Sequence, residues 1–395
     1  MSTTIAAIIA TLITTGMTSA VSHQFTQIGG CVAAVILTVI NLLSRNARIY
    51  PTFLFGSLSM CVIVLLSSEA NIADFSSTIY VLSCYLALIG LCTASEDSSS
   101  FCRQLIMGNN LLLTAWVLHQ ASKVDGMRAW QISNPAGAGN AMAAQINMTL
   151  PFVIVSFHQS RGFLKAMYLA LLGANSAAVF FIMSRNGIGC MLMIFTLYVL
   201  FDYRRIAIFV CAGISFLAAS FDSIAKLPVI REVLVRFRFV DYTSTTPRSL
   251  IWRIAKEHIV RNPMLGVGPG KTKEALSVIE TYHAHNNIIQ VVLESGIPAG
   301  IIITLLTIML LCLPVRMIFG SREGFLCTLP VLAYLGFSVT ATPLVYPAVT
   351  FLLVACVNEA RVAIQRDTQQ AVARRSSPFS RPDYQLASVP RRQLV

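Results

Sequence analysis

Long apolar stretches, separated by short polar segments, make up most of this chain. A helix needs about 20 mainly apolar residues to cross about 30 Å of hydrocarbon. The pattern therefore predicts twelve membrane-spanning helices. The seventh and eighth spans, and the eleventh and twelfth, are separated by very short turns, so each of these pairs could be miscounted. The predicted spans cover residues 4–21, 28–43, 50–67, 77–94, 105–121, 138–157, 165–183, 187–201, 205–220, 297–315, 325–341 and 343–359.

The composition agrees with a membrane-embedded chain. Hydrophobic residues make up 55% of the 395 residues and charged residues only 12%, with a mean hydropathy of +0.70. Soluble proteins carry about 25% charged residues, so we expect an all-α polytopic membrane protein. The first stretch has no positive residue ahead of it, which favours a span over a signal peptide. Most of the ten cysteines lie in apolar runs, where we expect packing residues rather than disulfides or metal ligands.

Basic residues at the span ends predict the orientation, because Lys and Arg resist translocation across the membrane. With an even number of spans, both termini lie on one side, and we expect that side to be the cytoplasm. The loops 67–77 and 123–137 on the opposite side are acidic or nearly balanced. The cytoplasmic short loops would then hold Arg45, Arg48, Arg103, Arg161, Lys165, Arg204, Arg205, Arg316 and Arg322.

The spans divide the chain into four predicted parts. Residues 1–220 form the first nine helices, 221–296 a polar loop opposite the cytoplasm, and 297–359 the last three helices. Residues 360–395 hold seven arginines with Ser, Pro and Gln and no periodic apolar pattern. We expect this last part to be a disordered basic tail near anionic headgroups.

The long polar loop carries part of the net charge of +12. Between residues 221 and 285 it has ten basic and six acidic residues, a surplus of four that topology does not explain. Arginine is suited to bidentate contacts with phosphate. A solvated surface accounts for most of these charges, and we expect two or three of them to be functional.

Within residues 246–270 of this loop, the sequence pattern predicts one helix. Thr246 can cap it, Pro247 suits its first position, and Asn262 before a proline ends it. Arg248 then lies in the first turn, where the backbone amides already favour an anion. Arg253 lies about 140° further around the helix, so it is a secondary candidate.

Two other features of residues 246–270 have both a structural and a functional interpretation. Trp252 is more typical of an interface anchor or core residue than of a platform on which a sugar stacks. The sequence "GVGPG" at 266–270 is a turn first and resembles a phosphate-binding loop only loosely.

A second basic outlier is Arg185, in "SRNGIG" at 184–189 between two predicted spans. An ionisable residue at the bilayer edge is a candidate functional residue, although an arginine there also extends to headgroup phosphates. Lys123 and Arg128 would add more weakly to the same positive field.

Histidines and asparagines gather at residues 283–287, before a predicted span. His283 and His285 are two residues apart, so only one is expected to face a given site. Metal binding is not expected, because no further ligands lie at a suitable spacing. We expect one of the histidines to act as a general base near neutral pH instead. Asn286 and Asn287 would fix its tautomer or bind hydroxyls. The following "IIQVVLE" predicts a short surface helix that ends at Gly296.

Together these motifs resemble the O-antigen ligase and polymerase superfamily of bacterial inner-membrane glycosyltransferases. The resemblance rests on "SRNG", on "RSLIW" followed by "NPMLGVGPG", and on "HAHNNIIQVVLESGIPAG", in this order and on the predicted side. It implies a GT-C-like fold of about twelve helices with one large helical periplasmic loop that carries the catalytic residues.

The resemblance also implies a reaction. A glycan is transferred from undecaprenyl pyrophosphate to a sugar hydroxyl, and in the ligase branch this hydroxyl belongs to lipid A-core. The transfer needs no metal or other cofactor and inverts the configuration at the anomeric carbon. The family's functional arginines fall on Arg185 and Arg248 and its histidine on His285. Arg253, His283, Asn286, Trp252 and Arg128 are expected to bind substrate. No nucleic acid is expected as a partner.

Two alternatives remain at this point. Polymerases of the superfamily often carry Arg-x10-Gly motifs in external loops, and here the only external match, Arg128 to Gly139, runs into a span, which favours the ligase. A lipid or glycan transporter would be expected to show internal repeats and charges within its spans, and the sequence has no such repeat.

Overall fold

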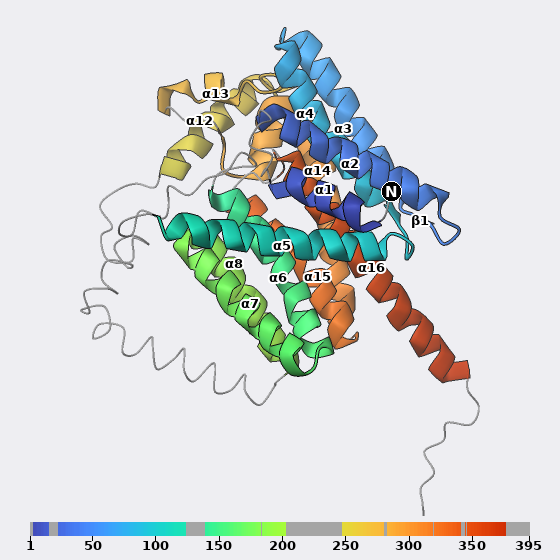
Figure 1. Ribbon diagram of the computed structural model, residues 1–395. Coiled ribbons are helices and arrows are strands. Elements are labelled where there is room, and N and C mark those ends of the chain that lie inside the picture. Colours follow the sequence, from blue (N-terminus) through green and yellow to red (C-terminus); the bar gives the residue numbers. More distant parts are fainter. Residues whose placement is uncertain are drawn as a thin grey trace, which may run out of the picture.

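The computed structural model describes residues 3–15, 23–123, 139–182, 184–202, 247–279, 283–318, 320–340, 344 and 346–376, and this part of the chain is almost entirely helical (Figure 1). Its longer helices are α1 (Thr3–Thr15), α2 (His23–Leu43), α3 (Pro51–Ala70), α4 (Phe75–Ala87), α5 (Ser99–Ala121), α6 (Gly139–Gln159), α7 (Gly162–Phe181), α8 (Arg185–Asp202), α12 (Pro247–Arg261), α14 (Asn287–Met317), α15 (Arg322–Thr340) and α16 (Pro347–Ser376). The short elements are η1 (Leu88–Cys92), α13 (Thr272–Ala275), η3 (Ser277–Ile279) and the strands β1 (Arg48–Ile49) and β2 (Thr93–Ala94).

The prediction of an all-α membrane protein is confirmed at this level. Within the described residues, six helices are long and apolar enough to cross a membrane, and three shorter apolar helices accompany them. The predicted span 205–220 lies outside the described residues, so the number of twelve spans stays a prediction. The six are α3, α4 with η1, α6, α7, α14 and α16.

Helix α16 forms the centre of the bundle. It packs against α1, α2, α4, α5, α6 and α15. Its close approach to α2 depends on Gly30, where a Cβ atom would lie 2.7 Å from the Cα of Ala348. The side chains of Phe351 and Phe337 are fully buried in this centre. Lipid-facing helices such as α7 bury far fewer of their residues.

The same helix corrects the predicted start of the disordered tail. α16 continues as a helix to Ser376, past residue 360, where we expected disorder to begin. This segment contains alanine, glutamine and arginine, which are good helix formers, and its first helix breaker is Pro378. Low hydrophobicity alone therefore did not end the helix. Residues 377–395 lie outside the described residues.

Two sets of loops lie at two different ends of the bundle. At one end β1 pairs with β2, and Arg366 of α16 lies 3.7 Å from Glu96. At the other end Lys271 donates a 2.7 Å hydrogen bond to the carbonyl oxygen of Asn71. The loop 67–77 and the long polar loop therefore share one side, as the basic-residue pattern predicts. Which side faces the cytoplasm stays a prediction.

Buried amides join the helices in the middle of the molecule. Asn109 of α5 donates to Gln145 of α6 at 3.0 Å, and Asn110 donates to Thr149 at 2.8 Å. In an apolar surrounding, small and polar contacts of this kind hold helices together where the hydrophobic effect does not. The cysteines that the structure describes are free thiols, and all except Cys312 are buried, in agreement with a packing role.

Candidate functional site

The segment from His283 to His285 is held through the backbone of the alanine between them. Ala284 is fully buried, and its amide donates a 2.8 Å hydrogen bond to Oε1 of Gln290. Its carbonyl oxygen accepts a 2.9 Å hydrogen bond from Nε1 of Trp252. Helices α14 and α12 therefore fix this peptide from both sides. Trp252 is exposed and holds the histidine segment through its indole N–H, and its contact with substrate stays a prediction.

Gln290 is in turn held by a buried polar cluster. Its Nε2 donates to Oε1 of Glu294 and to Oγ1 of Thr272, both at 2.6 Å. The Thr272 hydroxyl also lies 2.6 Å from the same Glu294 oxygen. All three side chains are buried. Because a buried amide or carboxylate without partners costs free energy, this cluster stabilises one position for Gln290 and, through it, for Ala284.

The glycine-rich loop closes a break in α14. Gly296 has φ 83° and ψ 174°, which ends the first part of this helix as the sequence predicts and exposes its last carbonyl groups. The amides of Val267 and Gly268 donate to the carbonyl oxygens of Leu293 and Glu294 at 2.8 and 3.1 Å. These loop amides are therefore occupied, and the "GVGPG" segment is a structural turn rather than a phosphate cradle.

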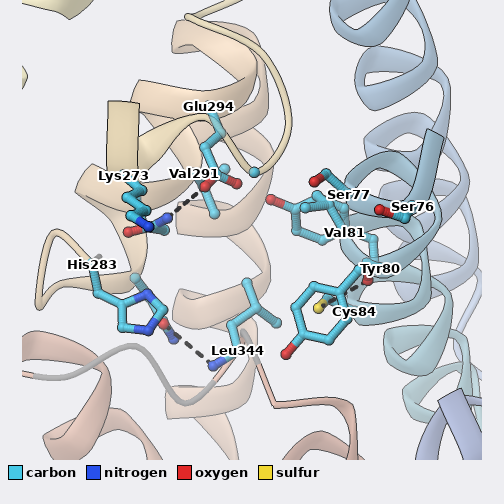
Figure 2. Close-up of a pocket in the computed structure, with 14 residues that line it drawn as sticks. Ser76, Ser77, Tyr80, Val81, Cys84, Lys273, His283, Val291, Glu294 and Leu344 are labelled. Carbon is cyan, nitrogen blue, oxygen red and sulfur yellow. Dashed lines mark hydrogen bonds between the residues drawn. The ribbon is translucent and has the colours of Figure 1, made fainter. Parts of the chain in front are cut away.

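A cavity of about 420 Å³ lies between α4 and the segment that carries His283. In Figure 2, Tyr80 extends from α4 toward the wall that carries His283 and Leu344. The amide of Leu344 donates to Oδ1 of Asn287 at 3.3 Å, which closes the lower part of this wall. The cavity is lined by Ser76, Ser77, Tyr80, Val81, Cys84, Tyr85, Gly270, Lys273, His283, Asn287, Gln290, Val291, Glu294 and Leu344.

The two histidines differ in their surroundings. Burial lowers the pKa of His283, and the nearby His285 lowers it further. A neutral imidazole at neutral pH can accept a proton or a hydrogen bond. His285 has a φ of +54°, a left-handed backbone conformation that histidine adopts less often than glycine and that is enriched at functional sites. The structure thus places His283, rather than His285, in the lining of the cavity.

The "SRNG" segment is a helix start packed closely on α6. The Ser184 hydroxyl accepts the amide of Gly187 at 3.0 Å and donates to Asn140 of α6 at 2.7 Å. Nδ2 of Asn147 donates to the carbonyl oxygen of Gly187 at 2.9 Å. A Cβ atom at Gly187 would lie 2.9 Å from Ala143, so glycine permits this approach. Arg185 is consequently fixed at the first position of α8.

Helix α15 connects this helix start with the histidine segment. The rings of Phe201 and Phe325 stack at 4.6 Å, and Sγ of Cys190 lies 3.9 Å from the carbonyl oxygen of Ala333, so α8 and α15 run antiparallel. The beginning of α8, with Arg185, therefore lies toward the C-terminal end of α15.

The same end of α15 holds the start of α14. Nδ2 of Asn286 donates to the carbonyl oxygen of Val339 at 3.1 Å, and Nδ2 of Asn287 donates to the Ser338 hydroxyl at 2.9 Å. Oδ1 of Asn286 caps α14 by accepting the amides of Ile288 and Ile289. Asn286 therefore has a structural task, and its contact with substrate stays a prediction.

The loop helix α12 begins at Pro247 and ends at Arg261, which confirms the predicted helix. Arg248 lies in its first turn, four residues before Trp252, so its backbone is one helical turn from the contact with Ala284. Arg253 is exposed and does not line the cavity. Arg128 lies outside the described residues.

Several residues of this site carry no motif that singled them out in the sequence. Thr272, Gln290 and Ser77 are of this kind. Glu294 offers one signal, since a carboxylate that follows an amide by four residues in an apolar helix is expected to need a partner. Among the described residues, no three His, Cys, Asp or Glu side chains gather as metal ligands.

Fold and site together define a helical membrane protein with a polar site at the end of its bundle, built from a short loop helix and a histidine segment. Residues 166–304 match the family model described as O-antigen ligase. This match supports the resemblance to the O-antigen ligase superfamily, whose members are glycosyltransferase-like enzymes. The matched stretch contains Arg185, Arg248 and both histidines. No curated protein matches the chain.

Proposed function

We propose that this protein is an O-antigen ligase of the bacterial inner membrane. It transfers a glycan from undecaprenyl pyrophosphate to a sugar hydroxyl of lipid A-core, without a metal and with inversion at the anomeric carbon. One observation carries the proposal. The start of α8, with Arg185, and the start of α14, next to His285, lie toward the same end of α15. Ala284 is clamped by its hydrogen bonds with Trp252 and Gln290, and this clamp brings α12, with Arg248, to the same end of the bundle.

In the proposed reaction the acceptor oxygen attacks the anomeric carbon as His285 takes the hydroxyl proton. The bond between that carbon and the diphosphate oxygen breaks, and undecaprenyl pyrophosphate leaves with the electron pair. Negative charge therefore grows on the diphosphate in the transition state. Arg185 and Arg248 would stabilise it as fixed positive charges, which is how preorganised groups lower a barrier.

His283 would contact the acceptor rather than take its proton. It lines the cavity, and its lowered pKa keeps the ring neutral at neutral pH. The two histidines then have different tasks on the two sides of one clamped residue, Ala284. Arg253 and Arg128 would contribute to binding the anionic donor further from the reacting atoms.

The proposed location follows from the same reaction. We place the site on the periplasmic side, both termini in the cytoplasm, and residues 221–296 in the periplasm. The shared side of the loop 67–77 and the residues around Lys271 supports this arrangement. Labelling of single cysteines introduced at Asn71 and at Ser321 in intact spheroplasts tests it, because only the first should react with a reagent that does not cross the membrane.

The product of a reconstituted reaction tests the function. Purified protein in liposomes receives lipid-linked glycan and lipid A-core, and products are separated on gels. A ladder of glycan on lipid A-core supports the ligase. Longer lipid-linked glycan without transfer to lipid A-core means a polymerase instead. Movement of the lipid across the bilayer with no bond exchanged means a transporter and contradicts the proposal.

A further inference from the structure

The cavity beside His283 has a chemical character of its own. Its described lining holds one lysine, Lys273, and one carboxyl group, Glu294, so it has no cluster of positive charges of the kind that would bind a diphosphate. The other groups are the imidazole of His283, the thiol of Cys84, hydroxyls, amides, two tyrosines and aliphatic side chains. A volume of about 420 Å³ is within the range of small-ligand sites, about 300–1,000 Å³. Such a lining suits a neutral polyhydroxyl ring better than a diphosphate.

The first turn of α4, at the edge of this cavity, already carries an anion. Asp74 caps the helix, and its carboxylate accepts the amide of Ser77 at 3.2 Å and the hydroxyl of Ser76. These hydrogen bonds lower the pKa of Asp74, which keeps the side chain ionised at neutral pH. The helix end that would otherwise attract phosphate is thereby neutralised, and a second anion is disfavoured there.

The wall that α4 presents combines an aromatic face with hydroxyls. Tyr80 is half-buried and extends into the cavity, opposite His283 (Figure 2). Ser76 and Ser77 lie one turn before it, and Val81 lies next to it. A sugar ring has an apolar face of C–H groups and a rim of hydroxyls. An aromatic side chain can pack on that face while polar groups bind the rim.

We infer that this cavity is the binding site for the acceptor sugar, with the Tyr80 ring against one face of the sugar and Asn287 and His283 at its hydroxyls, and that α4 selects which sugar is accepted. The inference rests on the proposed function and deepens it. Residues 75–87 lie outside the stretch 166–304 that matches the family model. The selecting wall therefore comes from a part of the chain that the family match does not cover, while the histidine wall lies within it.

Steady-state kinetics of two Tyr80 variants test this. Tyr80→Leu removes the aromatic face, and we expect the KM for lipid A-core to rise about tenfold while the KM for the lipid-linked glycan stays within about twofold. Tyr80→Phe keeps the face and should stay close to the wild type. Ile79→Ala is the matched control, because Ile79 neighbours Tyr80 on α4 but is 38% exposed and is not part of the lining.

A second variant covers the case in which Tyr80→Leu does not fold. Ser76→Leu places a bulky side chain on an exposed lining position, and we expect it to raise the KM for lipid A-core selectively. A rise in the KM for the lipid-linked glycan alone, with either variant, would assign the cavity to the donor and overturn the inference. Unchanged values for both substrates would overturn it as well.

A binding measurement separates this inference from the proposed function. Saturation-transfer NMR with delipidated core oligosaccharide and the full-length protein in nanodiscs needs no catalysis. If the wild type transfers no glycan, the proposed function fails, and the NMR signal still decides the inference. Binding that Tyr80→Leu abolishes and that sodium pyrophosphate does not displace supports the acceptor site. Displacement by pyrophosphate, or no binding to the wild type, contradicts it.

Discussion

The indole Nε1 of Trp252 lies 2.9 Å from the carbonyl oxygen of Ala284, the residue between the two histidines. This hydrogen bond joins the loop helix α12 to the segment before α14. Because Arg248 lies one turn earlier on α12, the same contact sets the distance between the backbone of an arginine and that of the histidines. The position of the proposed catalytic groups thus depends on a residue that need not touch substrate.

Replacing Trp252 with Phe should therefore slow transfer with little loss of stability. The variant keeps an aromatic ring but loses a hydrogen bond of about 1 kcal/mol, and we expect kcat to fall about tenfold because the histidine segment loses one support. Rates are measured in the liposome assay. Trp116→Phe is the control, because the buried Nε1 of Trp116 has no hydrogen-bond partner among the described residues. Equal rates for both variants would argue against the clamp.

The buried cluster at Gln290 predicts a stability effect. Thr272→Val removes the hydroxyl that contacts Glu294 and Gln290, and we expect the free energy of unfolding to fall by about 1–3 kcal/mol. Thermal unfolding in detergent, followed by intrinsic fluorescence, measures this. Thr304→Val is a matched control, since among the described residues the Thr304 hydroxyl donates to the carbonyl oxygen of Gly300 in its own helix. A similar Tm for the two variants would refute the cluster's role.

The break in α14 requires glycine at position 296. A methyl group there would overlap the carbonyl oxygen of Met264, in a backbone conformation that is nearly restricted to glycine. We expect Gly296→Ala to destabilise the protein by about 3 kcal/mol or more. Gly173→Ala in α7 should instead stabilise it by about 0.5–1 kcal/mol, because nothing lies within 4 Å of an added Cβ. Both shifts are measured by thermal unfolding, and a tolerated Gly296→Ala would contradict the described turn.

The acid–base behaviour of His283 gives a prediction with a defined sign. In the folded protein its pKa lies below the ordinary histidine value of 6.5, because of burial first and then because of His285. Below pH 6.5 the folded state therefore binds fewer protons than the unfolded state. The contribution of His283 to the free energy of unfolding is present above pH 6.5 and is lost as the pH falls through its folded-state pKa. In His285→Asn the pKa of His283 should move up toward 6.5. Imidazole NMR signals of ¹⁵N-histidine-labelled protein report this, and a downward shift would reverse the argument.

Much of the fold was predictable because apolar runs of span length leave few choices. Helix α12 was predictable as well, since a proline at its start and a proline after its end set both limits. The break at Gly296 followed from glycine near a proline. The tail was not predicted correctly, because its composition is polar enough for disorder and also rich in helix formers, and attachment to the buried part of α16 decides the outcome.

The site was only partly predictable. The motifs gave the segments that carry Arg185, Arg248 and the histidines, but sequence spacing does not show that α15 lies between two of them. Nor does it show which histidine faces a cavity, because this depends on the contacts of Ala284 with two helices distant in sequence. The α4 wall could not be found at all, since a tyrosine and two serines in an apolar span have no distinctive pattern.

The measurement that tests the central claim most directly is the rate of glycan transfer to lipid A-core by His285→Asn, in the presence of a chelator and beside the wild type. Asparagine tolerates the left-handed backbone of position 285, so the variant removes the imidazole and keeps the loop. We expect the wild type to retain full activity in the chelator and the variant to lose it by about 100-fold or more. A strict requirement of the wild type for a divalent ion, or near-normal transfer by His285→Asn, would contradict the account.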